Sequence, residues 1–358
     1  METNDDATAD VRSLAGRLGG PAVLIGAGRM GRSHGQALLR QGLAVGAVCD
    51  TNADNLAQAG DELSVSRAHR YSDSERLFQE IAGPGLVVVA TTADGHCDLV
   101  CRAAEAGARL VLCEKPMAPS VRECDRMLEV CESRGTRLAI NHQMRFMPQY
   151  ALVKEELCSG RFGRLASMGV VAGCFGVAMN GSHYVEAFRY LSESRLRTAT
   201  AWFSPEQLRS PRGPQFRDAA GELRFVAEDG SRLNLEIGAD QGHGMTVTYA
   251  TTWGHILVDE LAGEYTATAR KPEHREQPLT RYGLPADRWR RSFPPPDNVG
   301  PTAAVQEALI TGSDYPDGRV GRTVVAALAA AYRSAAEGSR EVALDDLGEF
   351  AQRRFPWA

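Results

Sequence analysis

Residues 22–31 read AVLIGAGRMG, and this stretch decides the fold of the first part of the chain. The four apolar residues predict a buried strand, and a helical pattern runs from about Arg29 to Gln41. Between them the glycines have the GxGxxG spacing in the strand–turn–helix context that a dinucleotide-binding loop needs. We therefore predict a Rossmann domain.

A glycine is needed at each of these three positions for a different physical reason. The first permits a tight turn, the second lets the backbone approach a pyrophosphate, and the third allows the helix and strand to pack closely. The pyrophosphate would lie at the helix N-terminus, against free N–H groups. The alternative is a set of glycines that only turn the chain. The predicted cofactor-binding residues here are Gly26, Gly28, Arg29, Met30 and Gly31.

Asp50 follows the next predicted strand, Leu43 to Cys49, and lies 19 residues after Gly31. An acidic side chain at this position accepts hydrogen bonds from the ribose hydroxyls of NAD and repels a 2′-phosphate. Thr51 and Asn52 follow, with no adjacent arginine to bind that phosphate. The sequence therefore favours NAD over NADP, with an ordinary turn aspartate as the alternative.

Three later apolar runs continue the alternation of strands and helices. Because these runs carry no charge in their centres, they indicate strands of a parallel sheet that helices cover on both faces. They span residues 86–90, 109–113 and 137–141, with helices expected from 94 to 107 and from 119 to 133.

After about residue 142 the pattern changes. Helical stretches at 149–158 and 182–191 mix with alternating strand-like runs, which indicates an α+β domain with a large, mainly antiparallel open sheet. Residues 269–301 are rich in proline, arginine and turn residues and are expected to form a long surface loop, and residues 322–337 a closing helix. The predicted organisation is a polar tail (1–19), a Rossmann domain (20–142) and a substrate-binding and oligomerisation domain (143–358).

Composition sets limits on partners and location. The chain has 358 residues and a formal net charge of −5, so no basic field favours nucleic acid or an anionic membrane. No apolar run approaches the roughly 20 residues that span a bilayer. The acidic, polar start does not resemble a secretory signal. We expect a cytoplasmic protein without a metal site, whose eight cysteines are reduced structural thiols.

Glu114-Lys115-Pro116 immediately follows a predicted strand, at the sheet edge where ligands of open α/β sheets bind. A lysine there can hydrogen-bond a substrate oxygen, although the tripeptide alone could also form a surface turn. Other ordered motifs are Ala90-Thr91-Thr92 with His96, and NHQMRFMP at residues 141–148. Together with GAGRMG, these motifs resemble those of the Gfo/Idh/MocA family of oxidoreductases, named for glucose–fructose oxidoreductase and inositol dehydrogenase.

The resemblance implies a Rossmann domain followed by an α/β domain whose open sheet often mediates oligomer contacts, so a homodimer or homotetramer is expected. It implies that Lys115 orients a substrate hydroxyl and that His183 takes its proton as hydride leaves. It also implies further cofactor-binding residues, namely Thr91, Thr92, His96, Glu114 and Lys115. The implied substrate-binding residues are Asn141, Arg145, Asn180 and His183.

The chain departs from the family pattern at Met179, where many members carry an aspartate four residues before the histidine. Either His183 acts without a carboxylate or Asn180 only positions the substrate, since an amide does not exchange a proton. For Arg145 the alternative is an interdomain salt bridge. Several arginines, including Arg288 and Arg290, would suit an anionic substrate if they converged on the site, but a solvated surface is the default.

The function predicted is NAD-dependent transfer of hydride between nicotinamide and a secondary alcohol or ketone of a sugar, cyclitol or nucleotide sugar. Two alternatives stay open. One is an enzyme that uses NAD for a transient oxidation within a redox-neutral, glycosidase-like reaction. The other is a dinucleotide-binding sensor, which would need the glycine loop but neither Lys115 nor His183.

Overall fold

A computed structural model describes residues 14–173, 176–205, 208–210, 212–238, 240–241, 244–295 and 297–358. Most of the predicted tail and Cys174 lie outside these ranges. The chain divides into two compact units. The first contains the described residues up to Gln143 together with Asp297–Val325 and Ala358, and the second contains Met144–Pro296 and Ala326–Trp357.

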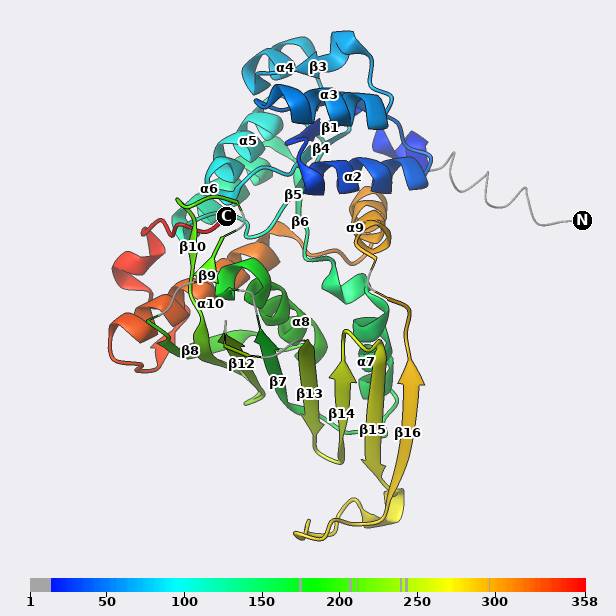
Figure 1. Ribbon diagram of the computed structural model, residues 1–358, viewed down its shortest axis with the longest axis vertical. Coiled ribbons are helices and arrows are strands. Elements are labelled where there is room, and N and C mark those ends of the chain that lie inside the picture. Colours follow the sequence, from blue (N-terminus) through cyan, green and yellow to red (C-terminus); the bar gives the residue numbers. More distant parts are fainter. Residues whose placement is uncertain are drawn as a thin grey trace, which may run out of the picture. The chain divides into compact units, whose positions relative to one another are not determined.

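The first unit is a parallel sheet with the strand order β3-β2-β1-β4-β5-β6, coloured blue to cyan in Figure 1. Runs such as Leu86–Val89 are wholly buried, as expected when helices cover both faces of a sheet. The strands are β1 (Ala22–Ile25), β2 (Val45–Cys49), β3 (Arg70–Tyr71), β4 (Leu86–Val89), β5 (Leu110–Cys113) and β6 (Arg137–Ile140).

Helices connect these strands, and each begins or ends where the local sequence dictates. Asn52 caps α3 through bonds to the backbone N–H groups of Asp54 and Asn55, and Gly135 ends α6 in the left-handed conformation. The helices are α2 (Arg29–Arg40), α3 (Ala53–Glu62), α4 (Ser74–Glu80), α5 (Ala93–Glu105) and α6 (Val121–Arg134).

A segment far along the chain completes the first unit. Helix α9 (Val299–Thr311) packs against α2 and lies just below it in Figure 1. Helix α10 (Gly318–Ala336) begins in the first unit and ends in the second. Arg322 on its first turns pairs with Asp125 of α6, with Nε and Oδ1 2.7 Å apart.

In the second unit, nine of the described strands form a sheet with the order β16-β15-β14-β13-β7-β12-β11-β8-β17. Strands β7 and β12 pair in parallel, and the other neighbours are antiparallel. The large, mainly antiparallel sheet predicted from the sequence is confirmed, and the parallel pair makes it mixed. Its strands are β7 (Leu165–Gly173), β8 (Leu196–Phe203), β11 (Gly221–Ala227), β12 (Arg232–Gly238), β13 (Met245–Thr251), β14 (Gly254–Asp259), β15 (Glu264–Arg270), β16 (Ala286–Ser292) and β17 (Val342–Ala343). A separate short pair is β9 (Leu208–Arg209) with β10 (Arg217–Asp218).

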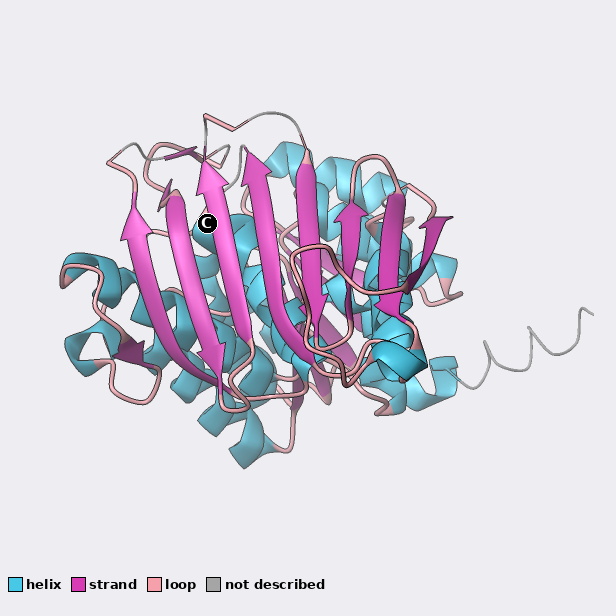
Figure 2. Ribbon diagram, turned by 90° about the horizontal axis from the view of Figure 1, so that it is seen from below, coloured by secondary structure: helices cyan, strands magenta, loops and turns pink. Residues whose placement is uncertain are grey.

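One face of this sheet is covered by helices and the other is open. Alternation along β11 buries Leu223 and Phe225 and exposes Glu222 and Arg224, so the two faces differ in polarity. The helices are α7 (Pro148–Cys158), α8 (Ser182–Ser192) and the end of α10. Figure 2 shows the strands from the open side, with the helices of the unit behind them.

The expectation of a loop over residues 269–301 was wrong. It contains strand β16, which pairs along its whole length with β15, and the start of α9. The charges of β16 are tolerated because it is an edge strand, where charged side chains reach water and discourage further pairing. Arg288, Arg290 and Arg291 are all exposed there, and Arg290 pairs with Glu264.

The described cysteines are free thiols, of which six are buried and Cys158 is exposed. Within the described ranges, no cluster of three or more His, Cys, Asp or Glu side chains could hold a metal ion. None of the helices in the described part of the chain is long and apolar enough to cross a bilayer.

Candidate active site

Three glycines shape the loop between β1 and α2. Gly26 has a φ of +90°, and a Cβ atom there would lie 2.6 Å from the carbonyl oxygen of Ala90. A Cβ at Gly31 would lie 1.8 Å from the carbonyl oxygen of Gly26. A Cβ at Gly28, by contrast, would meet no described atom within 4 Å, and no described side chain caps the helix that begins after it. The loop therefore leaves space over the first turn of α2, where the N–H groups and the helix dipole favour an anion. Arg29 and Met30 are the first residues of that turn.

Asp50 lies directly after β2 and binds the same loop. Its Oδ2 accepts a hydrogen bond from the backbone N–H of Ala27 at 2.6 Å, and its Oδ1 accepts one from Asn52 at 2.7 Å. The carboxylate is half-buried beside the loop. This position fits an aspartate that accepts bonds from ribose hydroxyls, which stays a prediction.

The turns after β4 and β5 are joined by His96. Its imidazole is buried, with Nδ1 3.0 Å from the carbonyl oxygen of Pro116 and Nε2 3.2 Å from that of Thr91. Both partners only accept hydrogen bonds, so satisfying both would require a protonated ring. Burial lowers the pKa of His96 and opposes that charge, although the carbonyl contacts act the other way. The half-buried Thr91 and Thr92 lie in the first of these turns.

Lys115 directly follows Glu114, the first residue after β5. Its side chain is half-buried, and its peptide bond to Pro116 is cis. The whole sequence contains three lysines, Lys115, Lys154 and Lys271, within a total of 40 lysines and arginines. A chain that uses arginine for nearly all its positive charge keeps a lysine at this strand end. This scarcity is a further signal in the sequence, separate from the Glu114-Lys115-Pro116 motif.

Glu114 is buried at the centre of a polar network. Its Oε1 accepts hydrogen bonds from His34 Nε2 at 2.8 Å and from Asn141 Nδ2 at 2.9 Å. Burial alone would raise the pKa of Glu114, but the bond from His34 and the nearby positive charge of Lys115 hold that pKa well below its usual range. Glu114 is therefore a carboxylate. Asn141, which was predicted to contact substrate, donates hydrogen bonds from its amide N–H groups to Glu114 and Gln143.

In the second unit, Arg145 forms a buried ion pair with Glu186 of α8. Its guanidinium also lies 4.6 Å from the centre of the Tyr190 ring, and Arg189 reaches the same carboxylate oxygen of Glu186 at 3.3 Å. The ion pair offered as the alternative for Arg145 exists, but it lies within the second unit. A contact of Arg145 with substrate stays a prediction.

His183 is the second residue of α8, and its side chain is half-buried. Asn180 is also half-buried and lies just before, in a π-helical turn (Val177–Gly181) continuous with α8. At the start of this turn, buried Asp218 of β10 accepts hydrogen bonds from the backbone N–H groups of Ala178 at 2.9 Å and Met179 at 2.7 Å. A carboxylate therefore binds the backbone at Met179, although the side chain there is apolar.

The candidate residues thus form two groups. The first group lies in the first unit, at or just after the carboxyl ends of the parallel strands. It consists of the glycine loop, Asp50, Thr91, Thr92, Glu114, Lys115, Asn141 and, on the first turn of α5, His96. Arg145, Asn180 and His183 lie in the second unit. His34 and Asp218 were not singled out from the sequence. His34 could have been found as the residue three positions after Gly31, on the first turns of the same helix.

Comparison with known proteins decides the family. The chain is 31% identical over 287 residues to inositol 2-dehydrogenase 2 of Saccharopolyspora erythraea, which covers 76% of this chain and 79% of the relative. The chain belongs to the Gfo/Idh/MocA oxidoreductase family. The profile of this family, described as an oxidoreductase family with an NAD-binding Rossmann fold, matches residues 21–142.

Other members of the Gfo/Idh/MocA family match over different lengths. A D-apiose dehydrogenase of Paraburkholderia graminis is 30% identical over 141 residues, 39% of this chain and 36% of that protein. The crystal structure of an oxidoreductase from Agrobacterium radiobacter, in complex with NAD+, L-tartaric acid and magnesium, superposes with a TM-score of 0.75 at 20% identity. That match covers 92% of this chain and 99% of the other, so the whole two-unit fold is shared. This chain is accordingly a nicotinamide-dependent dehydrogenase of the Gfo/Idh/MocA type.

Proposed function

We propose that this chain oxidises a secondary alcohol of a cyclitol, sugar or nucleotide sugar, or reduces the corresponding ketone, and that it uses NAD rather than NADP. The observation that carries the proposal is the placement of Lys115 at the carboxyl end of β5, next to the buried carboxylate of Glu114. The similarity to an inositol 2-dehydrogenase over most of both chains supports the class of substrate.

The residues present fit the cofactor. Gly28 leaves space at the uncapped start of α2 for a pyrophosphate, and Asp50 offers a carboxylate beside the loop for ribose hydroxyls. A carboxylate at this point repels the extra phosphate of NADP, which is the reason for preferring NAD. When bound, NAD supplies the chemistry of hydride transfer.

The chain's own side chains would supply the rest. We assign to the Lys115 ammonium a hydrogen bond to the substrate oxygen, which stabilises negative charge as it develops there. His183 takes the hydroxyl proton, a task suited to an imidazole because its ordinary pKa lies near neutrality. Arg145, Asn180 and the side-chain oxygen of Asn141 are proposed to hold the remaining hydroxyl groups, since the N–H groups of Asn141 already bind Glu114 and Gln143.

The test is NADH absorbance during a screen of inositol isomers, sugars and nucleotide sugars, with binding of NAD measured in parallel by calorimetry. Lys115→Ala and His183→Ala should abolish substrate-dependent NADH formation and retain NAD binding. Lys271→Ala and His255→Ala, which change exposed residues of the same types, should retain turnover.

Two results would change the proposal. Turnover that survives His183→Ala would show that another group accepts the proton. Firm binding of NAD with substrate consumed but no net NADH would favour the redox-neutral reaction over the dehydrogenase.

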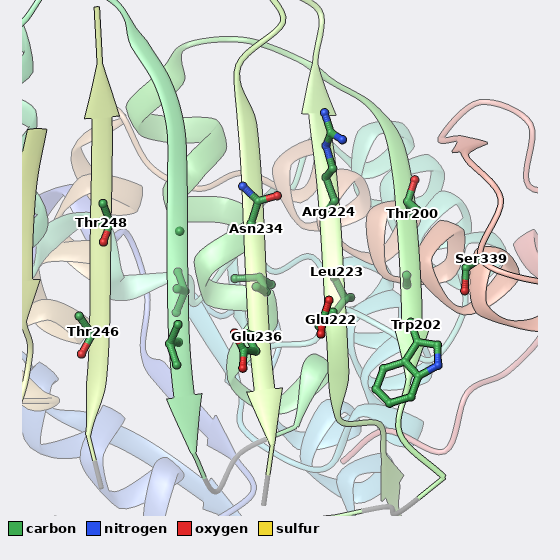
Figure 3. A pocket seen from close by; sticks show the side chains of 15 residues that line it. Thr200, Trp202, Glu222, Leu223, Arg224, Asn234, Glu236, Thr246, Thr248 and Ser339 are labelled. Carbon is green, nitrogen blue, oxygen red and sulfur yellow. The ribbon is translucent and has the colours of Figure 1, made fainter. Parts of the chain in front are cut away.

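We also propose that the chain assembles as a homodimer, or as a tetramer made of two such dimers, through the open face of the large sheet. This face has a hollow of about 450 Å³, and Trp202 is 55% exposed and Val171 48% exposed on it. Figure 3 shows Trp202, Glu222, Arg224 and Glu236 standing on this side of the strands. Because a two-fold contact sets each surface against itself, Arg224 of one copy can meet a glutamate of the other.

Light scattering on the purified chain tests this assembly. The wild-type protein should have at least twice the molar mass of one chain. The double variant Trp202→Lys with Arg224→Glu should have the molar mass of a single chain. A monomeric wild type at micromolar concentration would contradict the proposal.

A further inference from the structure

Helix α2 begins at the glycine loop and also carries a buried histidine, His34, whose side chain is 0% exposed. We propose that His34 is a positioning residue: it fixes the Glu114 carboxylate beside Lys115 and so joins the helix that would bind NAD to the lysine that would bind substrate. The proposal rests on the function proposed above for Lys115.

Both oxygens of Glu114 are held in place. Oε1 accepts hydrogen bonds from His34 Nε2 at 2.8 Å and from Asn141 Nδ2 at 2.9 Å, and Oε2 lies 3.2 Å from the backbone N–H of Lys115. Because a carboxylate only accepts, the proton of the imidazole is on Nε2. His34 on α2 and Asn141 after β6 thus hold the carboxylate of Glu114, which follows β5.

A second layer of hydrogen bonds holds this network from α9. Gln306 donates from Nε2 to the backbone oxygen of His34 at 3.1 Å. Thr302 donates to Oε1 of Gln143 at 2.7 Å, and the same oxygen accepts from Asn141 at 3.0 Å. All these side chains are buried, so water does not compete with the bonds. Such a supported network keeps a side chain in one geometry, as an active site requires.

The charged and titratable groups that act on Glu114 come from three neighbouring elements. They are His34 on α2, Lys115 next to it in the chain, His96 on α5 and Cys113 at the end of β5. Of these groups, His34 and the Lys115 ammonium act on the Glu114 carboxylate with positive charge and lower its pKa. Attraction between an ammonium and a carboxylate is mutual, so a fixed Glu114 favours the charged form of Lys115.

Removing the donor of His34 changes this balance. A buried carboxylate that loses a hydrogen bond carries a desolvation cost. Because the pKa of Glu114 lies far below the pH at which a lysine titrates, the side chain stays charged and moves toward another donor. Lys115 then loses a counter-charge in a fixed position. The pH at which Lys115 loses its proton should then fall.

The scarcity of lysine makes this directly measurable. After reductive methylation with ¹³C-formaldehyde, the three lysines and the N-terminus give a few resolved methyl signals, and Lys115→Arg identifies the signal of Lys115. The variants form a matched set. His34→Gln keeps an amide N–H long enough to reach Glu114, His34→Asn places the same amide one methylene short, and His69→Asn changes an exposed histidine of the same unit.

In His34→Asn the Lys115 signal should titrate about one pH unit lower than in wild type, with Lys154 and Lys271 unchanged. His34→Gln and His69→Asn should titrate as wild type does. With a substrate in hand, kcat should fall by about a hundredfold in His34→Asn and recover most of that loss in His34→Gln. If His34→Asn does not fold, His34→Leu fills the volume without a donor and takes its place.

Identical titration of Lys115 in wild type and in His34→Asn would overturn the proposal, whatever the turnover. The titration needs no substrate, so it separates the two claims. A shift in the Lys115 signal together with no turnover of any substrate by wild type would refute the proposed function and leave the positioning role of His34 in place.

Discussion

Replacing Arg145 with leucine should destabilise the second unit by about 3 kcal/mol, because Glu186 is left as a buried carboxylate with its better partner gone. The side chains of Arg145 and Glu186 are 3% and 0% exposed. Breaking such a pair costs about 3–5 kcal/mol. Arg189 stays within 3.3 Å of the carboxylate, which places the expected loss at the lower end of that range.

The assay is urea-induced unfolding followed by circular dichroism, with each transition fitted separately because the chain has two units. Arg189→Leu is the matched control. Its side chain is 27% exposed, and its removal should cost about 1 kcal/mol. The double variant Arg145→Leu with Glu186→Leu should recover most of the loss, since no fully buried charge is left without a partner and the partly exposed Arg189 can reach water.

A loss of less than about 1 kcal/mol in Arg145→Leu would refute the reasoning, because a buried carboxylate without its partner is costlier than that. A sharp rise in KM in the same variant would support the proposed contact of Arg145 with substrate, and an unchanged KM would contradict that contact.

Three further predictions concern the glycine loop, the cofactor and a buried acid. Gly31→Ala should lower both the melting temperature and the affinity for NAD, because its Cβ would lie 1.8 Å from the Gly26 carbonyl oxygen. Gly28→Ala should leave the melting temperature unchanged, because its Cβ would meet no described atom within 4 Å, and should weaken only the binding of NAD measured by calorimetry. In Asp50→Ser the ratio of the Kd for NADP to the Kd for NAD should fall by about tenfold, since the carboxylate that repels the 2′-phosphate is lost. Burial raises the pKa of Glu260 despite bonds from two tyrosines, so its neutral form favours folding. The free energy of unfolding of wild type should therefore fall relative to Glu260→Gln as the pH rises above about 4.3 and through the raised folded pKa.

Each of these has a contrary outcome. Equal stability of Gly31→Ala and Gly28→Ala would show that the loop can relax around the added methyl. An unchanged ratio of Kd values in Asp50→Ser would mean that Asp50 serves the loop backbone and not the ribose. A constant difference between wild type and Glu260→Gln from pH 4 to 8 would show that the Glu260 carboxyl keeps one protonation state in that range.

The first half of the fold could be predicted because its signals are local. Each parallel strand is a short apolar run, and β1, β4, β5 and β6 lie within one or two residues of the runs quoted from the sequence. Strand β16 could not be found in this way. Its residues are charged because it is an edge strand, and only the pairing with β15, which precedes it by a long connection, makes it a strand.

The candidate site divides in the same way. The glycine spacing and the Glu114-Lys115-Pro116 turn are contiguous in sequence, so they could be predicted. The partners of Glu114 and of the backbone at Met179 could not. His34 lies 80 positions before Glu114, and Asp218 lies 39 positions after Met179. A single sequence holds no record of which distant polar groups share a buried bond.

The return of residues 297–325 to the first unit bears on how such a protein can be cut and recombined. A fragment ending near residue 142 would lack α9, and with it the bond from Gln306 to His34 and the helix that packs on α2. A gene fusion that exchanged the nucleotide-binding part at one crossover would graft that part without its last helix. A working chimera therefore needs at least two junctions, so that Asp297–Val325 travels with the glycine loop it supports.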